Sequence, residues 1–208
     1  MNEANVPAPL AAVGVLHEKA VFSRRVRVLA ERLAPLLPPG GRILDVGCGD
    51  GSIARALAAL QPDVVIEGYD VFARPDAGIP VTRFDGAHLP VADGAAEAVV
   101  LVDVLHHAED AVALLRECAR VAPVIVVKDH IADSWLEERI LRFMDWVGNA
   151  PHGVVLPFHY FSTASWGAAL RAAGLRETER DQVPGLYPLP FSLVFGGRLQ
   201  FIARLAPR

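Results

Sequence analysis

Short apolar runs alternate with amphipathic stretches through the middle of this chain. The apolar runs predict five strands, at residues 42–46, 64–69, 81–84, 98–102 and 124–128. Two stretches with apolar positions three and four residues apart predict helices, at residues 52–60 and 109–121. Strands that are apolar on both faces are typical of a parallel sheet covered on both sides. The alternation therefore predicts an α/β protein with a doubly wound, Rossmann-like sheet and helices on both faces.

The two ends of the chain follow a less regular pattern. Helical periodicity covers residues 10–37 and stops at Pro38. Beyond the fifth strand the sequence predicts a helix at 133–148 and an aromatic loop at 149–161. A second helix follows, capped by Ser162 or Thr163 and ended by Gly174. Two strands, at 175–182 and 198–205, are joined by a loop at 184–190. We expect a single domain over residues 1–208, with a helical N-terminal extension at 1–38 and a substrate-side insertion at 131–162.

Composition and charge exclude several classes of protein. The chain has 208 residues, of which 52% are hydrophobic and 21% charged, as expected for a folded chain. Its net charge of −4 and the absence of a basic stripe argue against a nucleic-acid partner. No apolar run reaches the roughly 18 residues typical of a membrane span, so no membrane span is expected.

Cysteine usage and the N-terminus favour a cytoplasmic protein. Cys48 and Cys118 form no Cys-x-x-Cys pair, and the seven histidines lack the spacing of a zinc site. We therefore expect no metal and a reduced, cytoplasmic setting. No charged segment followed by an apolar run stands at the N-terminus, so no signal peptide is expected.

Residues 43–51 carry the strongest functional signal, reading Ile-Leu-Asp-Val-Gly-Cys-Gly-Asp-Gly. They predict a buried strand, a turn with glycine at every second position and the start of a helix. Glycine lets the backbone approach a ligand closely, and the free N–H groups of the helix point to the same place. A nucleoside-bearing ligand fits such a turn.

The spacing of the glycines distinguishes between classes of ligand. A dinucleotide-binding turn needs Gly-x-Gly-x-x-Gly, but Ser52 stands where its third glycine belongs. A phosphate-binding loop needs a lysine after its last glycine, and none follows Gly51. The observed Gly-x-Gly-x-Gly pattern therefore matches neither of these two ligand-binding turns.

A second motif follows the fourth predicted strand, where residues 102–107 read Val-Asp-Val-Leu-His-His. Together the two motifs resemble the class I S-adenosylmethionine (SAM) dependent methyltransferases, in particular the ubiquinone/menaquinone-type small-molecule group. The resemblance covers residues 40–130, and residues 175–208 by strand pattern alone. It implies SAM as the cofactor and a seven-stranded, mostly parallel sheet with an antiparallel C-terminal strand. The Asp/Asn-Pro-Pro-Tyr/Phe motif of DNA-base methyltransferases is absent, which argues against nucleobase methylation.

Acidic residues at consecutive strand ends extend the cofactor prediction. Asp70 follows the second strand, where a carboxylate accepts hydrogen bonds from both ribose hydroxyls. The resemblance implies that Asp45 holds the turn or faces the amino group of SAM, and that Asp85 accepts from the adenine amino group. The predicted cofactor site comprises Asp45, Gly47, Cys48, Gly49, Asp70, Val71, Asp85, Gly86, Asp103 and Val104. A single aspartate of this kind is also explained by a turn or a helix cap, whereas the grouping favours SAM.

Histidines near the same strand ends are the candidate bases. SAM carries an electrophilic methyl group, so the enzyme mainly aligns a nucleophile, and histidine assists when that nucleophile is a phenol or alcohol. We predict His130 and His106 as catalytic residues, with Asp129 orienting His130 or binding a cationic substrate. Alternatively, Lys128, Asp129 and His130 simply end a strand in polar residues, and His106 and His107 cap a helix.

The aromatic segment at 143–161 is predicted to supply the substrate pocket. The candidate contacts are His107, Trp146, His152 and Tyr160. Aromatic side chains also pack in cores without touching a ligand, and that alternative stays open. We expect a small organic acceptor methylated at O, N or C.

Three functions are compatible with these motifs. The first is methyl transfer to a small molecule. The second is a SAM-using enzyme that does not methylate, such as a cyclase that releases methylthioadenosine. The third is a non-catalytic SAM-binding protein. Product analysis separates the first two, because methyl transfer yields S-adenosylhomocysteine. A homodimer is the expected assembly, if the chain assembles at all.

Overall fold

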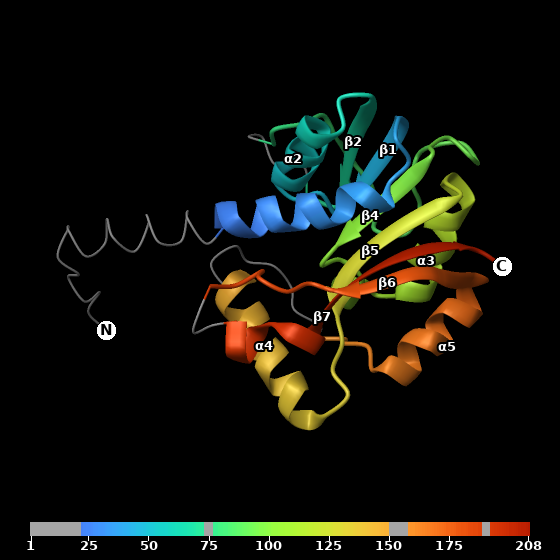
Figure 1. The fold of residues 1–208 in the computed structure, drawn as a ribbon. Coiled ribbons are helices and arrows are strands. Elements are labelled where there is room, and N and C mark those ends of the chain that lie inside the picture. Colours follow the sequence, from blue (N-terminus) through green and yellow to red (C-terminus); the bar gives the residue numbers. More distant parts are fainter. Residues whose placement is uncertain (1–21, 73–76, 150–157, 189–191) are drawn as a thin grey trace, which may run out of the picture.

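Seven strands form a single sheet in the computed structural model, which describes residues 22–72, 77–149, 158–188 and 192–208. The strands are β1 (Gly41–Val46), β2 (Val64–Asp70), β3 (Val81–Arg83), β4 (Ala98–Val102), β5 (Val124–His130), β6 (Leu175–Gln182) and β7 (Gln200–Pro207). Their order is β3-β2-β1-β4-β5-β7-β6 (Figure 1). β1 to β5 pair in parallel, and β7 lies antiparallel between β5 and β6. The predicted fold class is confirmed, including its antiparallel closure.

Helices cover both faces of the sheet. The described helices are residues 22–33, α2 (Ser52–Leu60), α3 (Ala111–Val121), α4 (Trp135–Asn149), α5 (Thr163–Ala173) and α6 (Ser192–Phe195), with 3-10 turns η1 (Ala34–Leu36), η2 (Leu105–His107) and η4 (Gly197–Leu199). None of these helices is long and apolar enough to cross a membrane.

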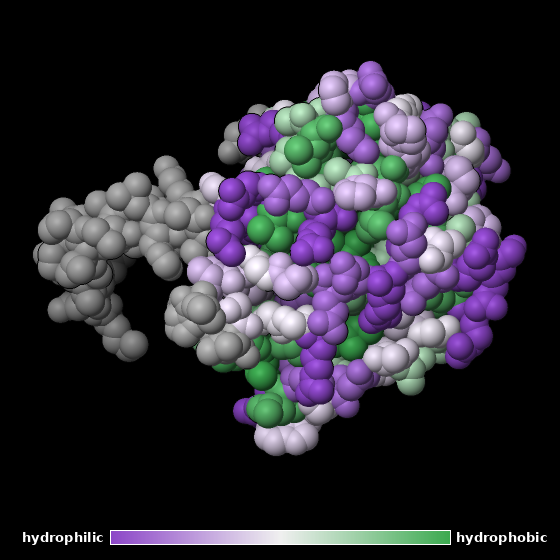
Figure 2. Space-filling view, viewed as in Figure 1, coloured by the Kyte–Doolittle hydropathy of each residue, from purple (hydrophilic) through white to green (hydrophobic). Residues whose placement is uncertain are grey.

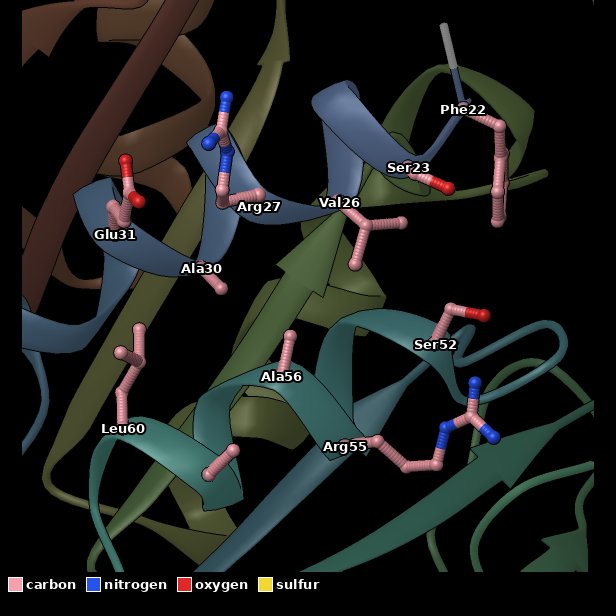
Figure 3. Close-up of a pocket in the computed structure, with 11 residues that line it drawn as sticks. Phe22, Ser23, Val26, Arg27, Ala30, Glu31, Ser52, Arg55, Ala56 and Leu60 are labelled. Atoms are coloured by element: carbon pink, nitrogen blue, oxygen red, sulfur yellow. The ribbon is translucent and has the colours of Figure 1, made fainter. Parts of the chain in front are cut away.

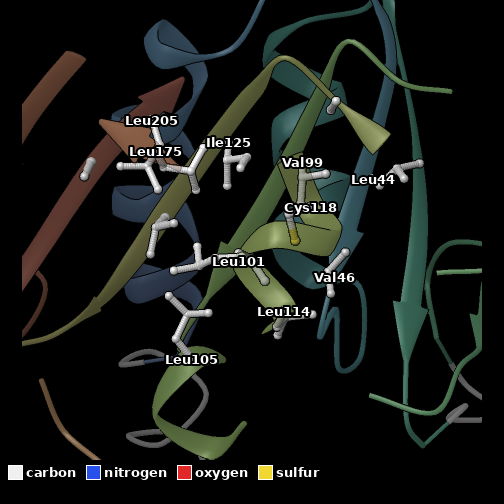
Figure 4. Packing of buried hydrophobic residues seen from close by; sticks show 14 of the residues in the cluster. Leu44, Val46, Val99, Leu101, Leu105, Leu114, Cys118, Ile125, Leu175 and Leu205 are labelled. Atoms are coloured by element: carbon white, nitrogen blue, oxygen red, sulfur yellow. The ribbon is translucent and has the colours of Figure 1, made fainter. Parts of the chain in front are cut away.

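Alternate strand positions divide the core into two layers. Leu44, Val99 and Ile125 belong to the cluster that includes α3 and α5 (Figure 4). The intervening positions, such as Ile43 and Val100, belong to the cluster that includes helix 22–33 and α2. Burying a side chain of this size contributes roughly 1.5–3 kcal/mol to the free energy of folding. A shift of the strand pairing by one residue would therefore lose several such buried side chains in both layers. The two layers therefore fix the register, and with it the strand ends that carry the polar residues.

β5 is longer than the sequence predicts, and the extra residues belong to the candidate site. It continues through Asp129 and His130 because β7 pairs with both, with His130 opposite Gln200. Successive strand residues point to opposite faces. Lys128 and His130 therefore turn towards the face covered by helix 22–33, and Asp129 turns towards the other face. One strand end thus delivers polar groups to both sides of the sheet.

The C-terminal third agrees with the sequence in part. The helix from Ser162 to Gly174 is confirmed, since Ser162 accepts the N–H of Ser165 and Gly174 ends the helix with a φ of 73°. The loop expected at 184–190 is followed by α6 and η4, which are too short to leave a periodic pattern in the sequence. Residues 10–21 of the first predicted helix and residues 150–157 of the aromatic loop lie outside the described residues.

Candidate active site

Three glycines after β1 shape the first half of the site. Gly47, Gly49 and Gly51 have φ angles of 75°, 57° and 71°, in the region that favours glycine. A Cβ atom on Gly47 would collide with Val104, and one on Gly51 would collide with Ile79. A Cβ atom on Gly49 would meet no described protein atom within 4 Å. Gly47 and Gly51 therefore allow the turn to pack against the protein, whereas Gly49 leaves its backbone uncovered on the open side of the turn.

Asp70 connects this turn to the end of β2. Its Oδ2 atom accepts the N–H of Gly49 at 2.8 Å, and its Oδ1 atom accepts a backbone N–H two residues further on at 2.9 Å. Each carboxylate oxygen has more than one lone pair, so Asp70 keeps acceptor capacity beside the turn. Asp45 lies buried next to it, and burial together with Asp70 and Asp50 raises the pKa of Asp45 to about 7. Burial likewise raises the pKa of the Cys48 thiol to about 12, which keeps it neutral.

Three further predicted cofactor residues lie at the ends of β2 and β3. The Asp85 carboxylate accepts the backbone N–H groups of His88 and Ala87 at 2.7 and 2.8 Å, and these bonds lower its pKa. Gly86 has a φ of 88°, and a Cβ atom there would lie 3.3 Å from Val71. Asp85 is therefore a charged, exposed carboxylate held by its own turn. Its contact with an adenine amino group stays a prediction.

Asp103 begins the second half of the site, directly after β4. It has a φ of 57°, a conformation that costs a non-glycine residue about 1–2 kcal/mol. Its carboxylate pairs with Arg25 and Lys128 and lies 3.3 Å from Nε2 of His130. Burial opposes ionisation, but the positive charges of Lys128 and Arg25 outweigh it, so the pKa of Asp103 lies well below its usual value. This charge network holds helix 22–33 against the end of β4.

His130 is buried and neutral, and its Nδ1 atom has no hydrogen-bond partner among the described residues. Burial and the neighbouring Lys128 lower its pKa to about 3. Its Nε2 atom faces the Asp103 carboxylate, which favours the tautomer with the proton on Nε2. Nδ1 then carries a free lone pair. Asp103 and His130 thus have the arrangement of a carboxylate that orients a base.

His106 lies between two carboxylates. Its Nδ1 atom is 2.6 Å from Asp129 and its Nε2 atom is 3.5 Å from Asp145. Burial opposes protonation of His106, but Asp129, Asp103 and Asp145 outweigh it and raise its pKa. The sequence predicts that Asp129 orients His130 or binds a cationic substrate. In the structure the Asp129 carboxylate bonds the His106 ring, and the carboxylate that faces Nε2 of His130 is that of Asp103.

Tyr160 and His107 complete the group of residues around His106. The Tyr160 ring centroid lies 5.7 Å from that of His106 and 6.3 Å from that of His130, and its hydroxyl donates to Asp145. The His107 ring lies 4.1 Å from that of His106. Burial and the charge of His106 lower the pKa of His107 to about 4. Both Tyr160 and His107 are only half-buried, so they form the accessible side of this histidine cluster, which comprises Asp103, His106, His107, Asp129, His130, Asp145 and Tyr160.

Not every predicted residue reaches the histidine cluster. Trp146 is 59% exposed and contacts Phe143, because α4 turns Asp145 inward and therefore the next residue outward. His152 lies outside the described residues. The sequence-based prediction omits Arg25, Lys128 and Asp145. Of these three, only Asp145 could have been found from the local sequence. It lies one helical turn after Leu141, and so on the buried side of the helix.

Three residues of the histidine cluster have the proximity of metal ligands. His106, Asp129 and His130 each offer one ligating atom, and these atoms lie within 4.8 Å of one another. His106 and Asp129 already bond each other, however, and Lys128 and Arg25 already supply positive charge beside His130. Hydrogen bonds and ion pairs within the described residues therefore already engage this group of side chains.

A groove of about 470 Å³ lies between helix 22–33 and α2 (Figure 3). Phe22, Val26 and Ala30 line one wall, and Ala56 and Leu60 line the other. None of its lining residues belongs to the histidine cluster or to the turn at 47–51. The assignment of the active site therefore depends on the side-chain geometry at the strand ends and not on this groove.

The fold and the site define a class I, Rossmann-like methyltransferase architecture, and comparison with known families agrees. A family model described as a methyltransferase domain matches residues 18–179. The chain belongs to the class I SAM-dependent methyltransferase family.

Individual relatives share only part of their length with this chain. The 27-O-demethylrifamycin SV methyltransferase of Amycolatopsis mediterranei is 29% identical over 119 residues, which cover 50% of this chain and 43% of the relative. The chain thus spans less than half the length of the curated relatives it matches first.

Two solved structures illustrate the shared fold. CalO1, a methyltransferase of calicheamicin biosynthesis solved with S-adenosylhomocysteine, superposes with a TM-score of 0.60 at 19% identity, covering 97% of this chain and 59% of its own. The [4+2]-cyclase SpnF superposes with a TM-score of 0.62 at 17% identity, and the match covers 88% of this chain and 80% of SpnF. At these identities the likeness concerns the fold alone.

Proposed function

We propose that this chain binds SAM at the turn 47–51 and transfers its methyl group to a small organic acceptor. The observation that carries the proposal is the uncovered backbone of Gly49, with Asp70 bonded to its N–H and retaining free lone pairs. A bound SAM supplies a methyl group already activated by a sulfonium, so an aligned nucleophile is the main further requirement. Gly49, Asp70 and the neighbouring Asp45 would hold it, with Asp85 and Val71 at the nucleoside end.

We assign the role of general base to His130 and infer a hydroxyl acceptor, phenol or alcohol. The neutral imidazole accepts the hydroxyl proton at Nδ1 as the oxygen attacks. Asp103 keeps the ring in the required tautomer and offsets part of the cost of forming the imidazolium, which burial and Lys128 make unfavourable. Lys128 and Arg25 keep Asp103 ionised. His106, engaged by carboxylates at both ring nitrogens, contributes a fixed charge rather than a mobile proton.

A SAM-using enzyme that does not methylate is the second candidate. The likeness of this fold to that of a [4+2]-cyclase shows that the architecture also occurs in enzymes of other chemistry. This candidate keeps the same turn and the same Asp70. It differs in the product, because attack by the amino group of SAM on its own chain releases methylthioadenosine.

Product analysis with the purified chain tests both candidates. SAM binding is first measured by calorimetry. The chain is then incubated with SAM and a set of phenols and alcohols, and the nucleoside products are identified by mass spectrometry. Methyl transfer predicts S-adenosylhomocysteine in equal amount to a methylated acceptor. Methylthioadenosine would support the second candidate, and absence of SAM binding would overturn both.

A further inference from the structure

Helix α4 exposes four large apolar side chains and buries two of its acids. The exposed fractions are 72% for Trp135, 54% for Leu136, 54% for Phe143 and 59% for Trp146. Glu137 and Asp145, in contrast, are each only 7% exposed. At about 100° per residue, the four apolar side chains fall on one face of the helix and the two acids on the opposite one. Clustered exposed apolar side chains of this size mark an interaction surface.

Arginines are interspersed with these apolar side chains. The same helical spacing puts Arg139 within the exposed face, and Arg139 has no ion pair among the described residues. Arg142 borders the face and pairs with Glu138 at 2.7 Å. Arg198, whose side chain is 79% exposed, pairs with the buried Glu137. With Arg142 and Arg198 each neutralised by an acid of α4, Arg139 is the cation that this surface leaves without a counter-charge among the described residues.

The apolar face continues onto α6. Phe143 stacks on Phe195 of α6 with 6.4 Å between ring centroids, and Val194 is 50% exposed. Figure 2 shows green and purple side chains next to each other at the lower left of the molecule, where Figure 1 places α4 and α6. We call this surface, formed by Trp135, Leu136, Arg139, Phe143, Trp146 and Val194, the α4 face.

We propose that the α4 face docks on an anionic lipid bilayer, with α4 lying flat at the level of the headgroups. Tryptophan and phenylalanine enter the boundary between headgroups and acyl chains, while arginine binds anionic headgroups. The exposed side chains protrude separately from a convex helix face. A bilayer can deform around such side chains and so contact all of them. The proposal depends on this surface alone and not on methyl transfer.

A second copy of the chain is a poorer occupant of the α4 face. A two-fold contact centred on the α4 face would put Arg139 close to its own counterpart, because Arg139 lies near the middle of that face. Glu138, the acid nearest on the helix, is already paired with Arg142. Two free guanidinium groups would then be desolvated without a counter-charge, which is strongly unfavourable.

Vesicle binding by the full chain tests the proposal. The protein is sedimented with vesicles of phosphatidylcholine alone and of phosphatidylcholine mixed with phosphatidylglycerol. We expect binding to the mixed vesicles, weakened by salt. Tryptophan fluorescence gives a second readout, because Trp166, the third tryptophan, is already buried. A blue shift on adding mixed vesicles therefore reports burial of Trp135 and Trp146.

Matched variants identify the surface that binds. Arg139→Glu is expected to lose at least tenfold in vesicle affinity and most of the blue shift. The double variant Trp135→Gln/Trp146→Gln is expected to lose sedimentation with mixed vesicles. Arg171→Glu, the same charge change at an exposed site on α5, and Val65→Gln, a change of an exposed apolar side chain on β2, should bind as the parent does.

Three outcomes would overturn the proposal. The first is no sedimentation with mixed vesicles. The second is equal loss in Arg139→Glu and Arg171→Glu, which would indicate net charge rather than the α4 face. The third is a dimer of the parent chain in analytical ultracentrifugation that the double tryptophan variant converts to a monomer, since the α4 face would then bind a second copy.

Discussion

The two halves of the site differ in how they are built. The turn after β1 is contiguous in the sequence, and the groups that we propose to face the cofactor are mainly backbone atoms of its glycines. The histidine cluster is assembled from the residue after β4, from η2, β5 and α4, and from the residues before α5, and it consists of side chains. The first half depends on local conformation and the second on tertiary packing. Substitutions should therefore separate cofactor binding from catalysis, and the predictions below test that separation.

Replacing His130 by alanine is expected to have the largest effect. General-base catalysis contributes typically 10²–10⁴-fold to a rate, so His130→Ala should lower kcat by about that factor once an acceptor is known. SAM affinity, measured by calorimetry, should stay unchanged, since His130 belongs to the cluster half. His159→Ala changes an exposed histidine and serves as the control. If His130→Ala retains its turnover, another residue is the general base. If it loses SAM affinity, the turn and the histidine cluster are energetically coupled.

Replacing Gly49 by valine should have the reciprocal effect. The φ of 57° strains any β-branched residue, and the new side chain enters the space beside the turn. We expect SAM affinity to fall by two or more orders of magnitude, because a Cβ occupies the place of close backbone approach. Gly94→Val is a matched control: Gly94 has a φ of 63° and no described atom within 4 Å of a Cβ, but it lies in the loop before β4.

Circular dichroism and calorimetry together distinguish strain from lost binding. Both glycine variants should keep the spectrum of the parent and lose similar amounts of stability. If Gly94→Val also loses SAM binding, or Gly49→Val keeps it, the turn does not hold the cofactor.

The same contrast explains how far the sequence alone can predict this molecule. The turn and the strand order follow from residues near each other in the chain, so the spacing of Gly47, Gly49 and Gly51 and the apolar runs predict them. The partner of Asp129 does not follow, because it depends on how far β7 extends β5 and on which face each residue then points to. Arg25 gives no local signal either, since its role arises only when helix 22–33 packs on β4.

Asp70 allows a finer test within the turn half. Asp70→Ala removes charged hydrogen bonds to a bound ribose, at roughly 1.5–3 kcal/mol each, so SAM affinity should fall about tenfold to a hundredfold. Asp85→Ala should reduce SAM affinity by a smaller factor, because the Asp85 carboxylate is exposed and screened by solvent. Calorimetric titration of both variants with SAM checks the order. Equal losses would show that the two strand ends contribute alike, and an unchanged affinity in Asp70→Ala would remove Asp70 from the site.

The smallest expected effect concerns stability against pH and tests the cluster half without any ligand. The pKa of His130 is about 3 in the folded chain and about 6.5 when unfolded. The unfolded chain thus binds a proton that the folded chain refuses, and the free energy of unfolding falls as the pH drops from about 6.5 towards 3. His106 acts in the opposite direction: its pKa is raised, so its contribution is complete below about 6.5 and lost as the pH rises through the folded value.

Urea denaturation at a series of pH values separates these two contributions. Each proton contributes at most about 1.4 kcal/mol per pH unit to the slope. His130→Gln should therefore flatten the loss of stability on the acid side, whereas His106→Gln should flatten the loss on the alkaline side. His159→Gln, which changes an exposed histidine, serves as the control. His130→Gln could instead shift the free energy of unfolding equally at every pH, without changing the slope on the acid side. That result would show that His130 is protonated in the folded chain and would exclude it as a base with a free lone pair at Nδ1.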